Sequence, residues 1–211
     1  MTIAQRSPPR PWWKCDRKTL VVAGLLLVVA VVWLTARITI TYDERQAATA
    51  LELLGAQVYY DYQWDSDGRF IQPVGPVWLL RLFGNARAVT GHSSTLTDAH
   101  LVHLNALTQL EILDLTNTQV SGTGFRDVDQ LTKLKGLYLA RTPFNDEGLK
   151  TVVRFSGLQD IILSQTPVSD EGIACLKRLR NPHSLRLDGT RCSAEGINKL
   201  RQEFPSCQIV P

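Results

Sequence analysis

The sequence predicts an α/β fold in which short parallel strands alternate with helices. The first observation is a fixed period of 24 residues that runs from Leu110 to the C-terminus. Two of its apolar columns are Leu113, Leu137, Ile161, Leu185 and Leu115, Leu139, Leu163, Leu187. The second observation is the order inside each unit, where a strand-like alternation precedes helix-start residues and an apolar helical stripe. Because no hairpin signal joins successive strands, we expect a parallel sheet with helices on its outer side.

Each unit also repeats its polar and small residues. Ser121, Asn145, Ser169 and Ser193 are good N-caps, and acids follow three of them, where the positive end of a helix favours negative charge. The threonine column is Thr118, Thr142, Thr166 and Thr190, whose hydroxyls are expected to bond backbone groups in the turn. The glycine column is Gly124, Gly148, Gly172 and Gly196. Glycine lowers helix propensity there, so a close backbone contact is expected in every unit.

Two stretches carry a family resemblance. Residues 166–173 read T-P-V-S-D-E-G-I and residues 142–149 read T-P-F-N-D-E-G-L. They resemble bacterial leucine-rich-repeat proteins whose units read T-x-V-[ST]-D-x-G-L, and they are similar to the cysteine-containing repeats of eukaryotic ubiquitin-ligase substrate receptors. The resemblance covers residues 86–211 and implies a leucine-rich-repeat solenoid, with parallel strands on the concave side and helices on the convex side. Such repeats are binding scaffolds without catalytic residues, which implies a non-catalytic protein-binding module.

The N-terminal part predicts a membrane anchor. Residues 19–36 carry no charge, and as a helix they span roughly 27 Å, close to the ~30 Å hydrocarbon core of a bilayer. Five basic residues precede this segment, whereas only Arg37 and Arg45 lie close behind it. The positive-inside rule therefore predicts a single-pass protein with residues 1–18 in the cytoplasm and residues 37–211 in the periplasm or another extracytoplasmic space. A cleaved signal peptide remains the alternative, although Leu34 makes the only candidate cleavage site poor.

The charge distribution argues against nucleic acid as a partner. The chain carries a formal charge of +3, and residues 1–18 alone carry +4 from five basic residues and one acid. The remainder therefore sums to −1, which leaves no basic footprint for nucleic acid.

Residues 43–85 predict a small α/β cap for the open end of the solenoid. We expect a helix from Asp43, as its N-cap, to Gly55, then a strand over 57–62, a turn over 65–68 and a short helix over 76–83. The candidate surface aromatics of this segment are Tyr59, Tyr60, Tyr62, Trp64 and Trp78. They either plug the exposed end of the first repeat or stay accessible as an interaction surface.

The repeat array has irregular ends. Residues 86–109 predict a degenerate first repeat, with Val89 in the strand column and His100 in place of the glycine. At the other end, Ile209 fits only the strand of a further unit. Pro211 is well placed to discourage pairing along that edge.

No catalytic, metal or cofactor site is predicted. His100 and His103 stand three residues apart, but no local Cys, Asp or Glu cluster completes a metal site. Cys175, Cys192 and Cys207 lie in an expected oxidising compartment, so a disulfide between two of them stays open. There is no phosphate-binding glycine loop and no serine nucleophile elbow, and we expect the protein not to be an enzyme.

The concave face supplies the candidate binding residues. One column projects Asp114, Tyr138, Ile162 and Arg186, and the next projects Thr116, Ala140, Ser164 and Asp188. Tyr138 and Arg186 belong to residue types that dominate interface energies. We expect a membrane-anchored module that binds a partner protein. The alternative is a structural, envelope-organising protein that associates with itself through the cap or the C-terminal edge strand.

Overall fold

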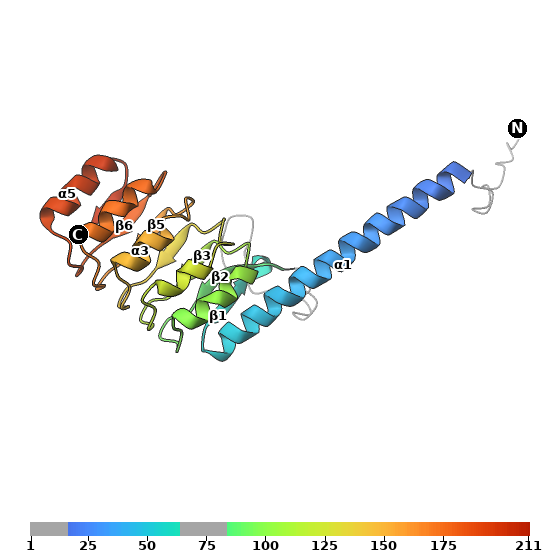
Figure 1. Cartoon of the computed structure of the whole chain (residues 1–211), viewed down its shortest axis with the longest axis horizontal. Helices are drawn as coiled ribbons and strands as arrows, with labels where there is room; N and C mark the ends of the chain where they lie inside the picture. Colours follow the sequence, from blue (N-terminus) through green and yellow to red (C-terminus); the bar gives the residue numbers. More distant parts are fainter. Residues whose placement is uncertain (1–16, 64–83) are drawn as a thin grey trace, which may run out of the picture. The chain divides into compact units, whose positions relative to one another are not determined.

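Helix α1 (Arg17–Leu53) is longer than the sequence predicts. The computed structural model describes residues 17–63 and 84–211 (Figure 1). Its two compact units are Met1–Ile40 and Thr41–Pro211, and α1 contributes residues to both. The predicted break before Asp43 is wrong, because residues 37–45 contain no glycine or proline that would interrupt helical hydrogen bonds. Asp43 is therefore not an N-cap. The predicted C-terminal end is confirmed, since Gly55 adopts a φ of 92° and its N–H donates to the carbonyl of Glu52.

The first unit presents an apolar helical surface. Val21, Leu27 and Trp33 are exposed over 57–67% of their surface. The hydroxyls of Thr35 and Thr39 donate to the carbonyls of Val32 and Thr35 within the helix, so they need no water. By length and hydropathy, the segment Val21–Leu53 is a candidate membrane span, and a signal sequence near an N-terminus meets the same criteria. The predicted span of residues 19–36 largely falls within it.

Seven strands of the described residues form one sheet in sequence order. They are β1 (Gln57–Tyr60), β2 (Ala86–Thr90), β3 (Ile112–Asp114), β4 (Gly136–Tyr138), β5 (Asp160–Ile162), β6 (Ser184–Arg186) and β7 (Gln208–Val210). Strand β1 pairs antiparallel with β2, and every later neighbour is parallel. The register steps by 24 residues, from Leu113 to Leu137 to Ile161, which confirms the predicted α/β class and the strand positions.

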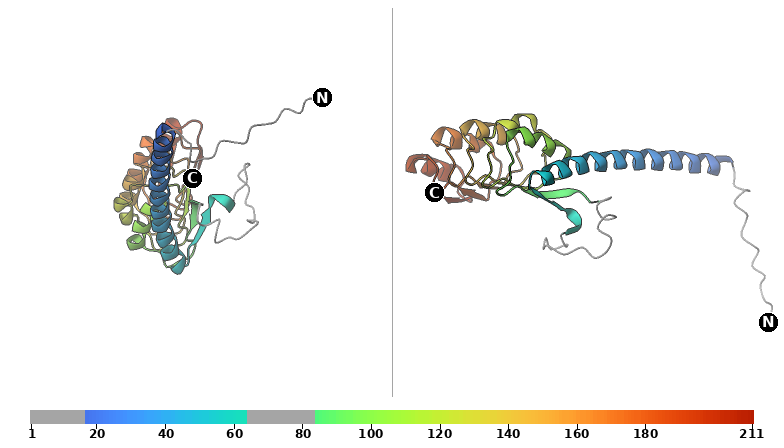
Figure 2. Two further views of the ribbon diagram at one scale, coloured as in Figure 1. Left: turned by 90° about the vertical axis from the view of Figure 1, so that its right-hand side faces the viewer. Right: turned by 90° about the horizontal axis from the view of Figure 1, so that it is seen from below.

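The helical segments of the repeats lie on one side of this sheet (Figure 2). They are η3 (Asp98–Ala106), η4 (Thr123–Asp127), α3 (Asp146–Val152), α4 (Asp170–Ile173), η5 (Ala174–Arg178) and α5 (Ala194–Glu203); a short η2 (Asp61–Gln63) follows β1. Asn145, Ser169 and Ser193 are confirmed as N-caps that accept backbone N–H groups. Ser121 is not an N-cap, because Gly122 occupies that place with a φ of 99°. The glycines at 122 and 124 disfavour an α-helix, and η4 is a 3₁₀ turn.

The core is one continuous apolar cluster. The predicted strand and helix columns are buried, including Val89, Leu139 and Leu163, and Pro182 fills its place in the apolar column. The threonine prediction is confirmed: the hydroxyls of Thr118, Thr142, Thr166 and Thr190 donate to carbonyls three residues earlier at 2.6–2.7 Å. At the N-terminal end, Leu51 of α1 and Tyr60 of β1 join the same cluster.

Aspartates at the starts of the helical segments join one repeat to the next. Asp98 accepts bonds from the N–H and hydroxyl of Ser121, both at 2.8 Å. Two further pairs, Asp146 with Ser169 and Asp170 with Ser193, repeat the contact at 2.6–2.8 Å. We name these bonds the aspartate column.

The aspartate column is interrupted at Gly122. There a side chain has no room, because an added Cβ would lie 2.5 Å from the Cα of Gly148. The close backbone contact predicted for the glycine column is confirmed at Gly124 and Gly148, where an added Cβ would lie 2.2 Å from the carbonyl oxygen of Asp98 and 2.9 Å from the Cα of Gly122. At Gly172 and Gly196 the nearest atom is instead a side-chain aspartate oxygen of the preceding repeat, at 2.2 Å.

Candidate binding surfaces

The sheet face opposite the helices gathers the predicted binding column. Asp114, Tyr138, Ile162 and Arg186 are paired in register across four neighbouring strands. Their chain neighbours Leu113, Leu137, Ile161 and Leu185 are buried, so this column projects away from the core. Arg186 is exposed and the other three are half-buried. We call this surface the open sheet face.

Tyr138 lies flat on the open sheet face. A Cβ added to Gly136 would lie 3.1 Å from the Tyr138 hydroxyl oxygen and 3.4 Å from its Cζ, so the missing side chain makes room for the ring. Burial raises the pKa of Tyr138, and the negative charges of Asp160 and Asp114 raise it further. The phenol therefore stays protonated near the carboxylates of Asp114 and Asp160 on the two neighbouring strands.

Two hydrogen bonds restrain the second predicted column, one within the column and one to Asp114 of the first column. The Ser164 hydroxyl donates to Asp188 Oδ1 at 2.6 Å, and the N–H of Thr116 donates to Asp114 Oδ1 at 2.9 Å. Thr116, Ser164 and Asp188 are half-buried. These three residues are therefore less accessible to a partner than the exposed Arg186 of the first column.

A further column at the same period was missed by the sequence prediction. Ser93, Asn117, Arg141 and Gln165 all have φ values of 57–59°, and Gly189 follows them with 70°. Asn117 Nδ2 donates to Ser93 Oγ at 2.9 Å, and Arg141 Nε donates to Gln165 Oε1 at 3.0 Å. The glycine at position 189 was the available signal, since it stands at the place where the chain turns left-handed.

The cap aromatics do not form a single exposed patch among the described residues. Tyr60 is 4% exposed, so this candidate surface residue packs in the core instead. Tyr62 is half-buried and stacks on Tyr60, with ring centroids 5.5 Å apart. Tyr59 is half-buried, and its hydroxyl donates to Gln57 Oε1 at 2.6 Å. Trp64 and Trp78, with the predicted turn and helix of that segment, lie outside the described residues.

The candidate histidines and cysteines do not form a metal site or a disulfide among the described residues. His100 Nδ1 accepts the N–H of Thr97 at 3.1 Å in a capping box. Within residues 17–63 and 84–211, neither His100 nor His103 belongs to a cluster of three or more His, Cys, Asp or Glu residues that could hold a metal ion. Cys175, Cys192 and Cys207 are free thiols. Burial raises the pKa of Cys192 and of Cys207. Reactive thiolates are therefore not favoured at either position.

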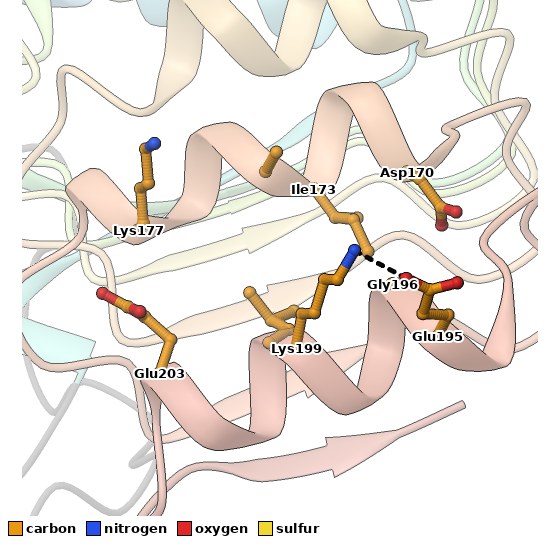
Figure 3. Close-up of a pocket in the computed structure, with 9 residues that line it drawn as sticks. Asp170, Ile173, Lys177, Glu195, Gly196, Lys199 and Glu203 are labelled. Carbon is orange, nitrogen blue, oxygen red and sulfur yellow. Dashed lines mark ion pairs between the residues drawn. The ribbon is translucent and has the colours of Figure 1, made fainter.

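A groove on the helical side was also missed by the sequence prediction (Figure 3). It lies between the α4–η5 segment and α5 and has a volume of about 490 Å³. It is lined by Asp170, Ile173, Ala174, Lys177, Glu195, Gly196, Lys199, Leu200 and Glu203. Ile173 and Leu200 are buried and give the groove an apolar floor, while Lys199 and Glu195 form an ion pair of 2.7 Å at its rim.

Comparisons with known proteins found similar structures but no matching protein family. No protein-family model matches the chain, and no curated protein matches it. A leucine-rich-repeat protein of Leptospira interrogans is similar in structure, with 23% identity, a TM-score of 0.42, and coverage of 51% of this chain and 27% of its own. Internalin C2 of Listeria monocytogenes is similar with 16% identity, a TM-score of 0.48, and coverage of 77% of this chain and 61% of its own. The chain thus spans less than two thirds of either structure, and neither similarity carries a functional argument.

Proposed function

We propose that this chain is a membrane-anchored leucine-rich-repeat solenoid that binds a partner protein outside the cytoplasm, without catalysis. The observation that carries the proposal is the column of Tyr138, Ile162 and Arg186 on the open sheet face. The ring of Tyr138 is held over Gly136, and Arg186 has no ion-pair partner among the described residues. A fixed aromatic ring and an available guanidinium are typical of interface hot spots.

The dimensions of this face favour a weak or transient complex. Seven strands about 4.8 Å apart extend it to roughly 29 Å. With a few residues per strand, its area is of the order of 300–400 Å², against ~800 Å² per partner in a standard interface. A tight complex would need contacts beyond the open sheet face.

Substituting Tyr138→Ala together with Arg186→Ala is expected to abolish partner binding while leaving the thermal unfolding midpoint almost unchanged. Both side chains project away from the core; Arg186 is exposed and Tyr138 is half-buried, so the loss of stability is expected to be much smaller than at a fully buried core position. The measurement is recovery of crosslinked partner from intact membranes, compared with a control variant, Arg178→Ala, which changes an exposed residue of η5 on the helical side. Unchanged recovery of the partner by the double variant would remove the open sheet face from the proposal.

The topology has its own test. A reporter that is active only outside the cytoplasm, fused after Pro211, is expected to be active, and the full-length chain is expected to stay in the membrane pellet. The apolar exposed surface of α1 supports this expectation. A soluble product that begins near Arg37 would instead show a cleaved signal peptide.

Self-association through the C-terminal edge strand is the weaker candidate. The Arg201 guanidinium donates to the carbonyl of Ile209 at 3.4 Å, and Pro211 offers no N–H. Both features reduce the number of backbone groups that β7 presents to another strand.

A further inference from the structure

A row of cations bridges successive repeats on the helical side. Lys150 Nζ lies 2.8 Å from Glu171 Oε1 of the next repeat and 2.9 Å from Glu147 Oε1 of its own. One repeat earlier, Arg126 lies 4.0 Å from Glu147. In both cases the cation stands 21 residues before the acid that it reaches in the next repeat. The Lys150 side chain is 38% exposed, so much of its aliphatic stem is covered.

This row is broken at the last junction. Ala174 stands 24 residues after Lys150, where the next bridging cation belongs, while the corresponding acid is still present as Glu195. Glu195 pairs instead with Lys199 on its own helix, in a contact whose side chains are 78% and 72% exposed. The groove of about 490 Å³ opens at this place, and Figure 3 shows Glu195 and Lys199 along one side of it.

The groove offers an apolar surface next to acidic side chains, as does the place where Lys150 reaches Glu171. Its floor is Ile173 and Leu200, and a further acid, Glu203, forms no ion pair among the described residues. The groove is lined by three carboxylates, those of Asp170, Glu195 and Glu203, against the two ammonium groups of Lys177 and Lys199. An apolar floor with an excess of negative charge suits an aliphatic stem that ends in a cation.

We propose that this groove binds a lysine or arginine side chain of a partner protein. The stem lies on Ile173 and Leu200, and the cation reaches Glu195, as Lys150 reaches Glu171 one repeat earlier. The partner thus completes the row that Ala174 leaves open. The site is separate from the open sheet face and does not depend on binding there. Because the acids are exposed, the interaction is weak and sensitive to salt.

The test uses the full chain in lipid nanodiscs with labelled methyl groups and Nα-acetyl-lysine amide as the probe. We expect the probe to shift the methyl resonances of Ile173 and Leu200, and Nα-acetyl-norleucine amide, an uncharged analogue of similar length, to shift them far less. Ala174→Lys restores the row within the chain, so it is expected to abolish the shifts without lowering the thermal unfolding midpoint. Glu195→Gln is expected to weaken probe binding by up to about fivefold, which corresponds to the ~1 kcal/mol of an exposed ion pair.

A matched variant opens an equivalent groove one repeat earlier. Lys150→Ala removes the bridging cation there, and the probe is then expected to shift Leu149 and Leu176, the residues 24 positions before Ile173 and Leu200. Equal shifts with lysine and norleucine probes would overturn the proposal, as would probe binding that survives Ala174→Lys. An absence of shifts at Ile173 and Leu200 in the unmodified chain would overturn it as well.

Discussion

Replacing Phe125 with alanine is expected to lower the free energy of unfolding by about 3–5 kcal/mol. Phe125 is fully buried, and its ring meets Phe144 and Phe155 of the next repeat edge-on, each with centroids 6.3 Å apart. The substitution therefore removes contacts within one repeat and across a junction, and it leaves a cavity. Chemical unfolding of the full chain, followed by circular dichroism, measures the loss.

Two kinds of substitution control this result. Leu139→Ala and Leu163→Ala empty fully buried positions directly after β4 and β5 and are expected to cost ~2–5 kcal/mol each. Arg186→Ala changes an exposed strand residue and is expected to stay within about 0.5 kcal/mol. A loss for Phe125→Ala no larger than that for Arg186→Ala would contradict the core described above.

Asp98→Asn is expected to destabilise the fold by ~1–3 kcal/mol at neutral pH. Asp98 Oδ2 accepts the N–H and hydroxyl of Ser121, while Oδ1 accepts the N–H groups of Gly122 and Gly124 at 2.9 and 2.8 Å. An amide has only one oxygen, so its NH₂ group would face donors on one side. Ser121→Ala, which removes only the hydroxyl bond, is the matched milder variant.

The effect of Asp98→Asn depends on pH. Burial by itself raises the pKa of Asp98, but bonds from Gly124, Ser121 and Gly122 outweigh it, so the pKa lies below its usual value. A lowered pKa means that the stabilisation is complete above the unfolded-state value of ~3.9 and is lost as the pH falls through the folded-state value. The difference in unfolding free energy between the two proteins should therefore shrink in acid. A difference that stays constant across this range would contradict the role of the carboxylate.

The strand register was predictable because it is strongly determined by burial. A slip of one residue would move Leu137 to the open face and Tyr138 into the core. The same logic placed Tyr138 and Arg186 in one outward column. The capping residues followed from local chemistry, since Asn145, Ser169 and Ser193 each accept a backbone N–H from the first turn of their own helix.

Contacts between repeats were harder to predict. Asp146 and Asp170 were expected to act only on their own helices, yet their carboxylates also reach Ser169 and Ser193 in the next repeat. Arg154 likewise donates across a junction, to the carbonyls of Phe125 and Val128. A local helix pattern does not contain such pairs. The only sign of these aspartate–serine bonds in the sequence was the constant spacing of 23 residues between each aspartate and its serine.

The interruption of the aspartate column at Gly122 has a consequence for cooperativity. In a repeat array, stability is approximately a sum of units and nearest-neighbour couplings. The pKa values of Asp98 and Asp170 are lowered by their hydrogen bonds, so acid weakens the couplings that these two carboxylates supply. The Gly122–Gly148 junction has no carboxylate in that place and is packed through Phe125 and Phe144 instead. We therefore expect acid to loosen the junctions at Asp98 and Asp170, on either side of the Gly122–Gly148 junction, before it loosens that junction itself.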